Sequence, residues 1–388
     1  MSLAVSLCQQ SDYNPETLRL SLIRLLKPFG GIGSFVKPGQ RVLIKPNLLA
    51  GKAPEKAVTT HPELVHQVIL LVQQAGGLVT VGDSPGLGKP EQVARKCGLR
   101  AVIDATGANF AAFEDSLPVP FSGGTFHHLE VAREALETDV IINLPKLKTH
   151  QMMGYTGAVK NLFGLVVGAR KARLHLQAGT DKAFFALMLL ELAERFLPAL
   201  NIMDAIVGME GDGPGSGDPV QLGALLASPS PQALDTVAIR LVDLPQDRIW
   251  TQKVARQTGR QGTDIKEITL FGPPLGSLCV KPIRPAKSAD INFGLPSPVK
   301  HLLKNALTAQ PEITESCQLC RQCVTHCPPE AMHCKGTKIT IDLHRCIRCF
   351  CCQELCPHGA VATRQGVLLR LADFLHGSRS PRPPEDAP

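Results

Sequence analysis

The sequence predicts an α/β fold with a mainly parallel, layered sheet, followed by a small α+β module rich in cysteine. Two observations support this class. Strand-like apolar runs alternate with helix-like segments through about the first 270 residues, which is typical of parallel sheets whose strands are joined by helices. Beyond this region, cysteines recur at short and regular spacing.

The predicted elements follow one another in a regular order. RVLIKPN (41–47) is a buried strand, and HPELVHQVILLVQQAGG (61–77) is a helix that begins at Pro62 and stops at its two final glycines. The remaining elements are strand 78–86, strand 138–150, helix 157–168, helix 181–198, strand 199–209, strand 222–228, helix 231–242 and strand 264–272. In such folds ligands bind beyond the carboxyl ends of the strands.

The same pattern divides the chain into four segments. We expect residues 1–272 to form the α/β domain. Residues 273–312 contain PPLG, KPIRPAK and LPSP and therefore predict a Pro-rich connecting arm. The cysteine-rich domain covers 313–365, and residues 366–388 are expected to form a helix and a disordered tail.

The composition argues against a nucleic-acid-binding protein, a membrane-spanning protein and a secreted disulfide-rich protein. The chain has 388 residues and a formal net charge of +7, and no run rich in Lys and Arg indicates a nucleic-acid partner. No stretch approaches 18 uncharged apolar residues, so we expect no membrane span. Thirteen cysteines in a long chain whose N-terminus lacks a signal-peptide pattern favour a reducing, cytoplasmic compartment over a secreted disulfide scaffold.

Two cysteine runs share the pattern C-x2-C-x2-C-x3-C-P, namely CQLCRQCVTHCP (317–328) and CIRCFCCQELCP (346–357). Three thiolates at this spacing hold one cubane, and the fourth, followed by Pro, ligates the other cluster. Structural zinc is the alternative, but zinc requires neither the third cysteine nor the Pro. The runs predict two [4Fe–4S] clusters, one on Cys317, Cys320, Cys323 and Cys356 and one on Cys346, Cys349, Cys352 and Cys327.

The cysteine-rich segment resembles the bacterial two-[4Fe–4S] ferredoxins. The repeat extends past the ligands, because CPPEAM (327–332) matches CPHGAV (356–361). Such internal symmetry is what a ferredoxin-like module with a pseudo-two-fold axis needs. The resemblance implies one-electron transfer at low potential.

Basic side chains lie where predicted strands end. Lys146, Lys148 and His150 lie at the end of strand 138–150, and Lys45 lies at the end of strand 41–47. They could converge on a carboxylate or phosphate, which makes Lys146, Lys148 and His150 candidate catalytic groups. The alternative is that they are solvated loop residues. The candidate residues for binding an anionic substrate are Lys45, Asn47, Asp83, Lys160, Asn161, Glu210 and Asp212.

The acidic candidates allow more than one interpretation. Glu210 and Asp212 lie in the Gly-rich stretch 208–219, which could offer backbone N–H groups to an anion, hold a cation, or form only a surface turn. Asp83 in GDSPG either serves a site or forms a local turn. Ser84 is excluded as the nucleophile of a hydrolase elbow, because the next residue is Pro85 and has no N–H for an oxyanion.

Taken in order along the chain, these stretches resemble a known family. IKPNLL, THPELV, VGDSPG, NLPKLKTH, TGAVKNLFG and GMEGDGP look like the domain of unknown function 362, whose members are often fused to a C-terminal ferredoxin module. The resemblance covers residues 1–272 and implies an architecture without a reaction. It also implies a shared pocket at Lys45, Asn47, Asp83, Lys146, Lys148, His150, Lys160 and Asn161.

Three functions compete on these grounds. The first is an iron–sulfur oxidoreductase that passes electrons from the two clusters to an anionic substrate or cofactor in the N-terminal domain. The second is an electron carrier without catalysis that docks a redox partner protein. The third is a maturation protein that holds a metal–cofactor precursor in the pocket. Covalent fusion of the two parts favours the first, because it raises their effective concentration.

Overall fold

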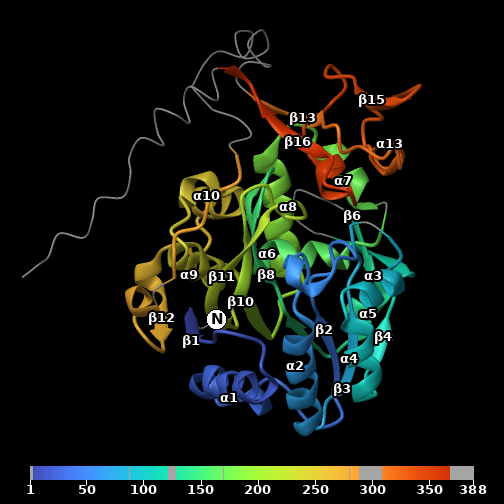
Figure 1. Cartoon of the computed structure of the whole chain (residues 1–388). Coiled ribbons are helices and arrows are strands. Elements are labelled where there is room, and N and C mark those ends of the chain that lie inside the picture. Colours follow the sequence, from blue (N-terminus) through green and yellow to red (C-terminus); the bar gives the residue numbers. More distant parts are fainter. Residues whose placement is uncertain are drawn as a thin grey trace, which may run out of the picture. The chain divides into compact units, whose positions relative to one another are not determined.

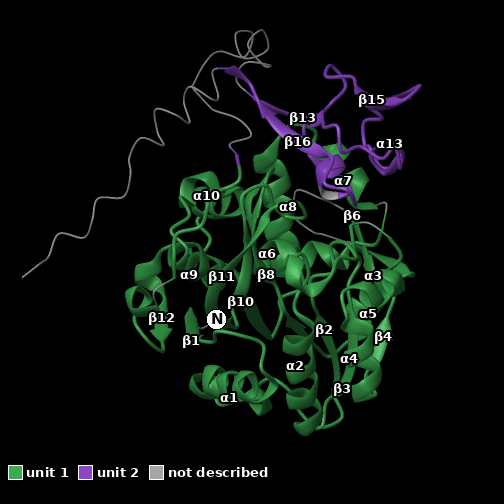
Figure 2. Ribbon diagram, viewed as in Figure 1, with its two compact units in different colours: residues 1–286 green, residues 287–388 purple. Residues whose placement is uncertain are grey.

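The computed structural model describes residues 3–86, 88–120, 128–168, 170–278, 280–287 and 308–367. The chain divides into two compact units, residues 1–286 and residues 287–388 (Figures 1 and 2). Each unit has its own sheets and its own buried core.

Unit 1 is built on a ten-stranded sheet whose main path runs β12-β1-β11-β10-β7-β2-β3-β4 (Figure 1). Neighbouring strands along this path are parallel except that β11 is antiparallel to both β1 and β10. The strands are β1 Ala4–Gln9, β2 Arg41–Lys45, β3 Leu78–Gly82, β4 Asn109–Ala111, β7 Val140–Asn143, β8 Lys146–His150, β9 Gly154–Thr156, β10 Leu200–Glu210, β11 Asp218–Ser228 and β12 Thr269–Phe271. The predicted α/β class with a mainly parallel sheet is confirmed.

Helices and a separate two-stranded sheet complete the described part of unit 1. The helices are α1 Pro15–Leu26, α2 Pro62–Gln74, α3 Pro90–Lys96, α4 Leu99–Thr106, α5 Arg133–Glu137, α6 Ala158–Asn161, α7 Arg170–Ala178, α8 Lys182–Arg195, α9 Pro231–Leu241 and α10 Trp250–Gln257. The two-stranded sheet pairs β5 Ser116–Pro120 with β6 His128–Ala132.

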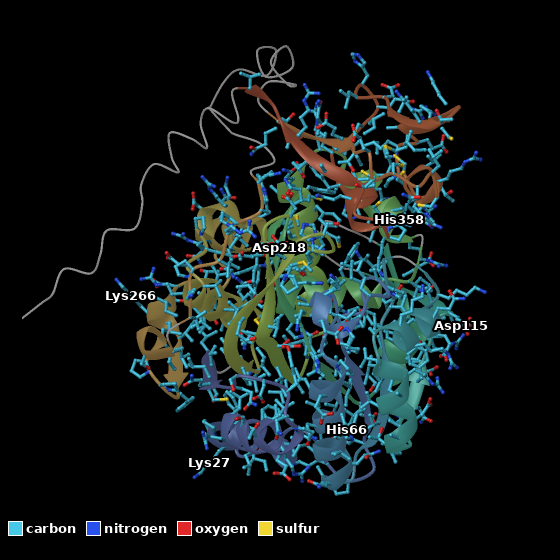
Figure 3. All side chains as sticks on the ribbon, in the orientation of Figure 1. Lys27, His66, Asp115, Asp218, Lys266 and His358 are labelled. Atoms are coloured by element: carbon cyan, nitrogen blue, oxygen red, sulfur yellow. The ribbon has the colours of Figure 1, made fainter. Side chains whose placement is uncertain are left out.

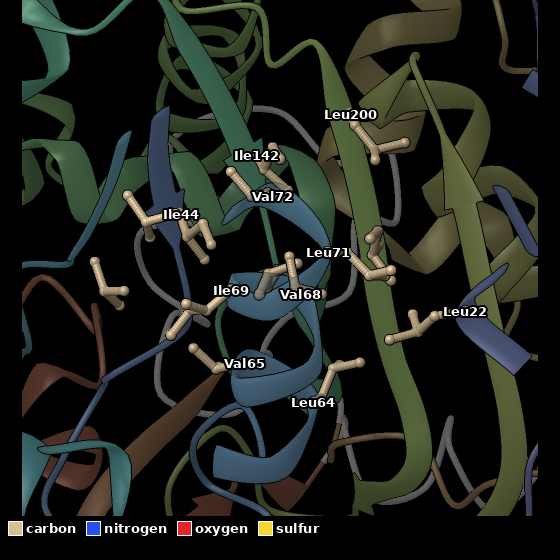
Figure 4. Packing of buried hydrophobic residues seen from close by; sticks show 14 of the residues in the cluster. Leu22, Ile44, Leu64, Val65, Val68, Ile69, Leu71, Val72, Ile142 and Leu200 are labelled. Carbon is tan, nitrogen blue, oxygen red and sulfur yellow. The ribbon is translucent and has the colours of Figure 1, made fainter. Parts of the chain in front are cut away.

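Both faces of the sheet are buried, which explains the nearly continuous apolar strands. Along β10, Ile202 and Ile206 pack into a core with α1 and α2. Figure 4 shows the part of this core around α2. The intervening Met203 and Ala205 pack into a second core that includes α9. Successive side chains of a strand point to opposite faces, so one strand supplies both cores. Asp204 lies between these apolar residues and is fully buried, so it requires partners inside the protein.

Several predicted boundaries differ from the structure. The predicted strand 138–150 is two strands, β7 and β8, separated by Leu144 and Pro145, since Pro has no N–H for a central strand. The predicted helix 157–168 is the short α6 followed by a 3-10 turn, Leu162–Leu165. The predicted strand 264–272 is reduced to β12, because the residues before it form a 3-10 turn at Ile265–Glu267.

In its described residues, unit 2 contains two small sheets and two short helices (Figure 2). Its elements are β13 Ala309–Ile313, α13 Gln322–Thr325, β14 Met332–Lys335, β15 Lys338–Ile341, α14 Cys351–Glu354 and β16 Val361–Gln365. β13 lies inside the segment 273–312 that the sequence predicted as a connecting arm. The predicted C-terminal helix and tail lie outside the described residues, apart from Gly366 and Val367.

Candidate functional site

The eight cysteines of the two runs surround two separate cavities in unit 2. The first cavity is lined by Cys317, Cys320, Cys323 and Cys356, and these residues are called the first site. The second is lined by Cys327, Cys346, Cys349 and Cys352, and these residues are called the second site. Each site thus receives three cysteines from one run and the fourth from the other, and sulfur atoms gather in this unit in Figure 3.

The loops around both sites share an unusual backbone. Leu319 and Arg321 have φ values of 52° and 58°, and Arg348 and Phe350, which occupy the matching positions of the second run, have 57° and 58°. Left-handed conformations are uncommon for residues other than glycine and indicate a local constraint. Backbones that alternate in this way turn successive N–H groups inward and form concavities for anions, including iron–sulfur clusters.

The two halves of unit 2 exchange strands as well as cysteines. In each half a strand leads into the cysteine loop and a short helix, and a second strand follows. β13 of the first half pairs with β16 of the second, while β15 pairs with β14. The fourth cysteines also match, because the N–H of Ala331 donates to Cys327 Sγ and the N–H of Ala360 donates to Cys356 Sγ, both at 3.2 Å.

The surroundings of the buried thiols disfavour the thiolate form, so a nearby positive charge would be needed to stabilise it. Burial, and then the nearby Cys356, Cys317 and Cys320, raise the pKa of the Cys323 thiol to about 11. Burial likewise raises the pKa of Cys352. Coordinated iron would hold such thiols as thiolates. Every described cysteine is a free thiol, so none is committed to a disulfide.

Cysteines dominate the potential metal ligands at both cavities. Among the described residues, no group of three or more His, Cys, Asp and Glu side chains that could hold a metal ion is found. The cysteine-rich donor set is compatible with iron–sulfur binding.

In unit 1, Lys146 lies in a buried network rather than on a solvated loop. Its Nζ is 2.8 Å from Asp204 Oδ2 and 3.0 Å from the hydroxyl of Tyr13, which donates to Asp204 Oδ1 at 2.7 Å. Asp204 also accepts the N–H of His61, whose ring stacks on Tyr13. Burial lowers the pKa of His61 to about 4, and its Nδ1 accepts the N–H of Glu63 at the start of α2.

Lys45 forms a second buried ion pair, with Asp83. Its Nζ is 2.7 Å from Asp83 Oδ1 and donates to the carbonyl of Pro46 at 3.1 Å. Asp83 Oδ2 accepts the N–H of Leu48 at 2.8 Å. Burial lowers the pKa of Lys45, an effect that Asp83 opposes. A Cβ on Gly164 would collide with Asp83 Oδ1 and come within 2.6 Å of Lys45 Nζ, so only glycine fits there.

Lys148 begins a chain of side-chain amides that crosses the sheet. Its Nζ donates to Asn47 Oδ1 at 2.9 Å and to the carbonyl of Val58. Asn47 donates to Asn161 at 2.8 Å, Asn161 to Asn143 at 2.8 Å, and Asn143 to Asn201 at 2.9 Å. Each of these side-chain amides accepts with its oxygen and donates with its nitrogen, which fixes the orientation of every amide in the hydrogen-bonded row.

The other candidates occupy different surroundings. His150 is fully buried, and its Nδ1 accepts the N–H groups of Met152 and Met153, which leaves the ring proton on Nε2. Glu210 pairs with Arg284 at 2.7 Å near the surface. Lys160 on α6 and Asp212 are half-buried.

The lysine-rich region therefore contains buried networks, in which Lys45 and Lys146 form ion pairs with carboxylates of the chain itself. The interpretation of Lys45, Lys146 and Lys148 as solvated loop lysines is wrong, because all three are almost completely buried. Sequence reasoning missed Asp204, although a single acid in an apolar strand was a signal for it. It also missed Tyr13, whose role no local pattern indicates.

Asp235 on α9 is a further residue that the sequence did not indicate. Its carboxylate accepts the N–H groups of Ala158 and Val159 at the start of α6, at 2.6 and 3.0 Å. The hydroxyl of Tyr155 also approaches it at 3.3 Å. Burial raises the pKa of Asp235 to about 7. The residue thus fixes the short helix that carries Lys160 and Asn161.

Comparison with known proteins assigns the family. The family model described as "Domain of unknown function (DUF362)" matches residues 42–240. The chain belongs to this family. The thylakoid-associated protein sll1697 of Synechocystis sp. is 39% identical over 302 residues, which are 78% of this chain and 94% of the relative. The DUF362 assignment made from the motifs is thereby confirmed.

A solved structure is also similar in part. The lactate racemase apoprotein from Thermoanaerobacterium thermosaccharolyticum covers 62% of this chain at 13% identity, with a TM-score of 0.39. The match spans 57% of that protein's chain. Within the described ranges, we find no helix of the length and apolar character needed to cross a membrane.

Proposed function

We propose that the protein is an iron–sulfur electron-transfer protein with two [4Fe–4S] clusters, one at each cysteine site of unit 2. The observation that carries the proposal is the arrangement of eight cysteines around two cavities, each with one ligand from the opposite half. Bound clusters would supply one-electron transfer. The left-handed loops and the N–H groups of Ala331 and Ala360 would stabilise the thiolate sulfurs.

Cluster content tests this proposal directly. Protein purified without oxygen is analysed for iron and sulfide and by native mass spectrometry. We expect the mass of two [4Fe–4S] clusters above that of the chain, and loss of one cluster in Cys323→Ser. Cys334→Ser is the matched control, because Cys334 lies in unit 2 but lines neither cavity. Two zinc ions, or no metal, would refute the proposal.

We infer further that unit 1 uses the electrons on an anionic substrate or cofactor. The support is the set of buried charges at the carboxyl ends of parallel strands β2, β3 and β7, since buried ionisable groups are concentrated at functional sites. Lys146, Lys148 and His150 are the catalytic candidates. At Lys45 and Lys146 an incoming anion would have to displace an aspartate, so these lysines would act only if their ion pairs open.

Reoxidation kinetics test the oxidoreductase proposal. The clusters are reduced with dithionite, and their reoxidation is followed by absorbance while carboxylate and phosphate metabolites are added in turn. An active compound should lose its effect in Lys148→Met with both clusters retained. Lys56→Met is the control, because Lys56 is an exposed lysine of the neighbouring turn Pro54–Lys56. Equal reoxidation in both variants would remove Lys148 from the site.

The second candidate is a carrier that docks a redox partner and has no substrate of its own. The observation in its favour is that Lys45 and Lys146 are already paired with Asp83 and Asp204. It predicts a stable partner and no reoxidation by small molecules. A maturation protein would instead retain a bound anion or metal without turnover.

We propose the cytoplasm as the compartment, because ligand cysteines must stay reduced. The relative's name adds association with thylakoids as a second hypothesis. Fractionation of cells that express the tagged full chain distinguishes the two.

A further inference from the structure

The outer face of α1 combines exposed apolar and basic side chains. Leu20 and Ile23 are 62% and 48% exposed, and residues three apart in a helix lie on the same face. Arg24 and Lys27 are exposed beside them, where the helix ends. Figure 1 shows α1 along an outer edge of unit 1, and Figure 3 labels Lys27 at that edge.

The loop that follows α1 continues this surface. The half-buried rings of Phe29 and Phe35 pack edge to face, with their centroids 6.2 Å apart. Between them lies the glycine-rich stretch GGIG (30–33), and the carbonyl of Gly33 accepts from Nζ of the exposed Lys37 at 2.8 Å. The name α1 surface is used below for Leu20, Ile23, Arg24 and residues 27–37.

The charge of this segment has one sign. Residues 17–40 contain no acid and four basic residues, Arg19, Arg24, Lys27 and Lys37. Arg24 and Lys27 form no ion pair within the described residues, and the guanidinium of Arg19 donates to the neutral amide of Gln74 at 2.9 Å. Basic residues in the last turn suit the helix dipole, but this effect accounts neither for Lys37 nor for the exposed apolar side chains.

We propose that the α1 surface docks on a membrane surface that carries anionic lipids. Leu20 and Ile23 enter the boundary between headgroups and acyl chains, where an amphipathic protein surface gains from apolar burial. Arg24 and Lys27 contact the anionic headgroups. A soluble polyanion would pair with the basic side chains but offer nothing apolar to Leu20 and Ile23. Such docking gives the thylakoid hypothesis above a binding site, and it does not depend on cluster binding in unit 2.

Vesicle binding of the full chain, purified without oxygen, tests the α1 surface. Binding is measured by sedimentation with phosphatidylcholine vesicles that contain or lack phosphatidylglycerol. We expect binding only with phosphatidylglycerol, and weaker binding at high salt. Arg24→Glu combined with Lys27→Glu should lower the affinity at least about tenfold, because two attractive charges become repulsive. Leu20→Ser combined with Ile23→Ser should lower it severalfold, because less apolar surface is buried in the membrane.

Two double variants are the matched controls. Arg240→Glu with Arg256→Glu reverses two exposed charges on α9 and α10, and α9 packs on the opposite face of the sheet from α1. Leu176→Ser with Leu197→Ser removes apolar side chains that are 47% and 41% exposed. Neither control should change vesicle binding. All four double variants change exposed residues, so their urea midpoints should stay close to that of the unmodified protein.

Tryptophan fluorescence measures whether the α1 surface enters the lipid. Trp250, the single tryptophan, lies at the start of α10, outside the α1 surface. In Leu20→Trp, vesicles with brominated acyl chains should quench the additional fluorescence. The fluorescence of the unmodified protein should not change with these vesicles.

Three results would overturn the assignment of the α1 surface. In the first, the unmodified protein does not bind phosphatidylglycerol vesicles. In the second, the control variants weaken binding as much as the α1 variants do. In the third, Leu20→Ser with Ile23→Ser binds as well as the unmodified protein, and dextran sulfate binds equally to both, which would assign the surface to a soluble polyanion or an acidic protein. Iron and sulfide assays of the same samples distinguish failure of membrane docking from failure of the two-cluster function.

Discussion

At the scale of single residues, the buried Lys146–Asp204 pair depends on two opposing effects, the free-energy cost of removing both charges from water and their mutual attraction. Both side chains are at most 1% exposed, so each charge depends on the other for compensation. The hydroxyl of Tyr13 donates to the other carboxylate oxygen, Oδ1, and the N–H of His61 donates to Oδ2 beside Lys146. Such a pair contributes little net stability when complete and causes a large loss when one partner is removed.

Lys146→Met should therefore destabilise unit 1 by about 3–5 kcal/mol. Urea unfolding followed by the fluorescence of Trp250, the single tryptophan, measures the free energy of unfolding of this unit. Arg41→Met is the control, because the Arg41–Asp139 pair is 59% and 37% exposed and should cost less than about 1 kcal/mol. Lys146→Met combined with Asp204→Leu should recover much of the loss, and an equal loss in the double variant would contradict the argument.

His61 should give unit 1 a pH-dependent stability whose sign follows from its lowered pKa. Its pKa is lowered to about 4 in the fold and is about 6.5 in an unfolded chain. Between these values the unfolded chain binds more protons, so the contribution of His61 is complete above pH 6.5 and is lost as the pH falls toward 4. Asp235, with a raised pKa of about 7, has the opposite sign over a similar range.

His61→Asn should remove only the histidine contribution, because Asn can also cap α2. Relative to the unmodified protein, the variant should gain stability as the pH falls from 7 to 5. The measurement is the urea midpoint from Trp250 fluorescence at each pH. A difference that stays constant with pH would show that His61 titrates alike in both states.

At the scale of elements, the 3-10 turn Leu162–Leu165 approaches Asp83 and Lys45 so closely that Gly164 has no room for a side chain. Gly164→Ala should cost about 1–3 kcal/mol, since an added methyl group must displace its neighbours. Gly33→Ala is the control, because a Cβ there meets nothing within 4 Å. Equal urea midpoints for the two variants would mean that Lys45 and Asp83 can move away from the added methyl group without loss of stability.

The helices and strands also show which parts of the fold could be predicted from the sequence. Apolar periodicity located α2, α8 and α9 to within a few residues, because their buried faces repeat at helical spacing. Periodicity did not separate β7 from β8, since strand-like residues with buried leucines lie on both sides of Pro145. The lysines of β8 were identified as important residues, but their partners were not, because Tyr13 and Asp204 lie far away along the chain and only the folded sheet brings them together.

At the scale of the whole molecule, the two units depend on different interactions. Unit 1 has two large apolar cores. Among the described residues, the buried cluster of unit 2 contains three cysteines of the proposed cluster sites, Cys323, Cys352 and Cys356, and four other buried residues. So small a core, made partly of buried thiols, contributes little apolar burial by itself. We therefore expect cluster binding to supply most of the folding free energy of unit 2.

Removal of iron with a chelator should therefore unfold unit 2 and leave unit 1 folded. Hydrogen exchange followed by mass spectrometry would then show loss of protection in β13–β16, while α2 and β10 keep theirs. The double variant Cys323→Ser and Cys352→Ser should give the same pattern without chelator, and Cys334→Ser should not. If the chelated protein kept full protection in β13–β16, the small apolar core would be sufficient to fold unit 2. Cluster binding would then not be required for the fold.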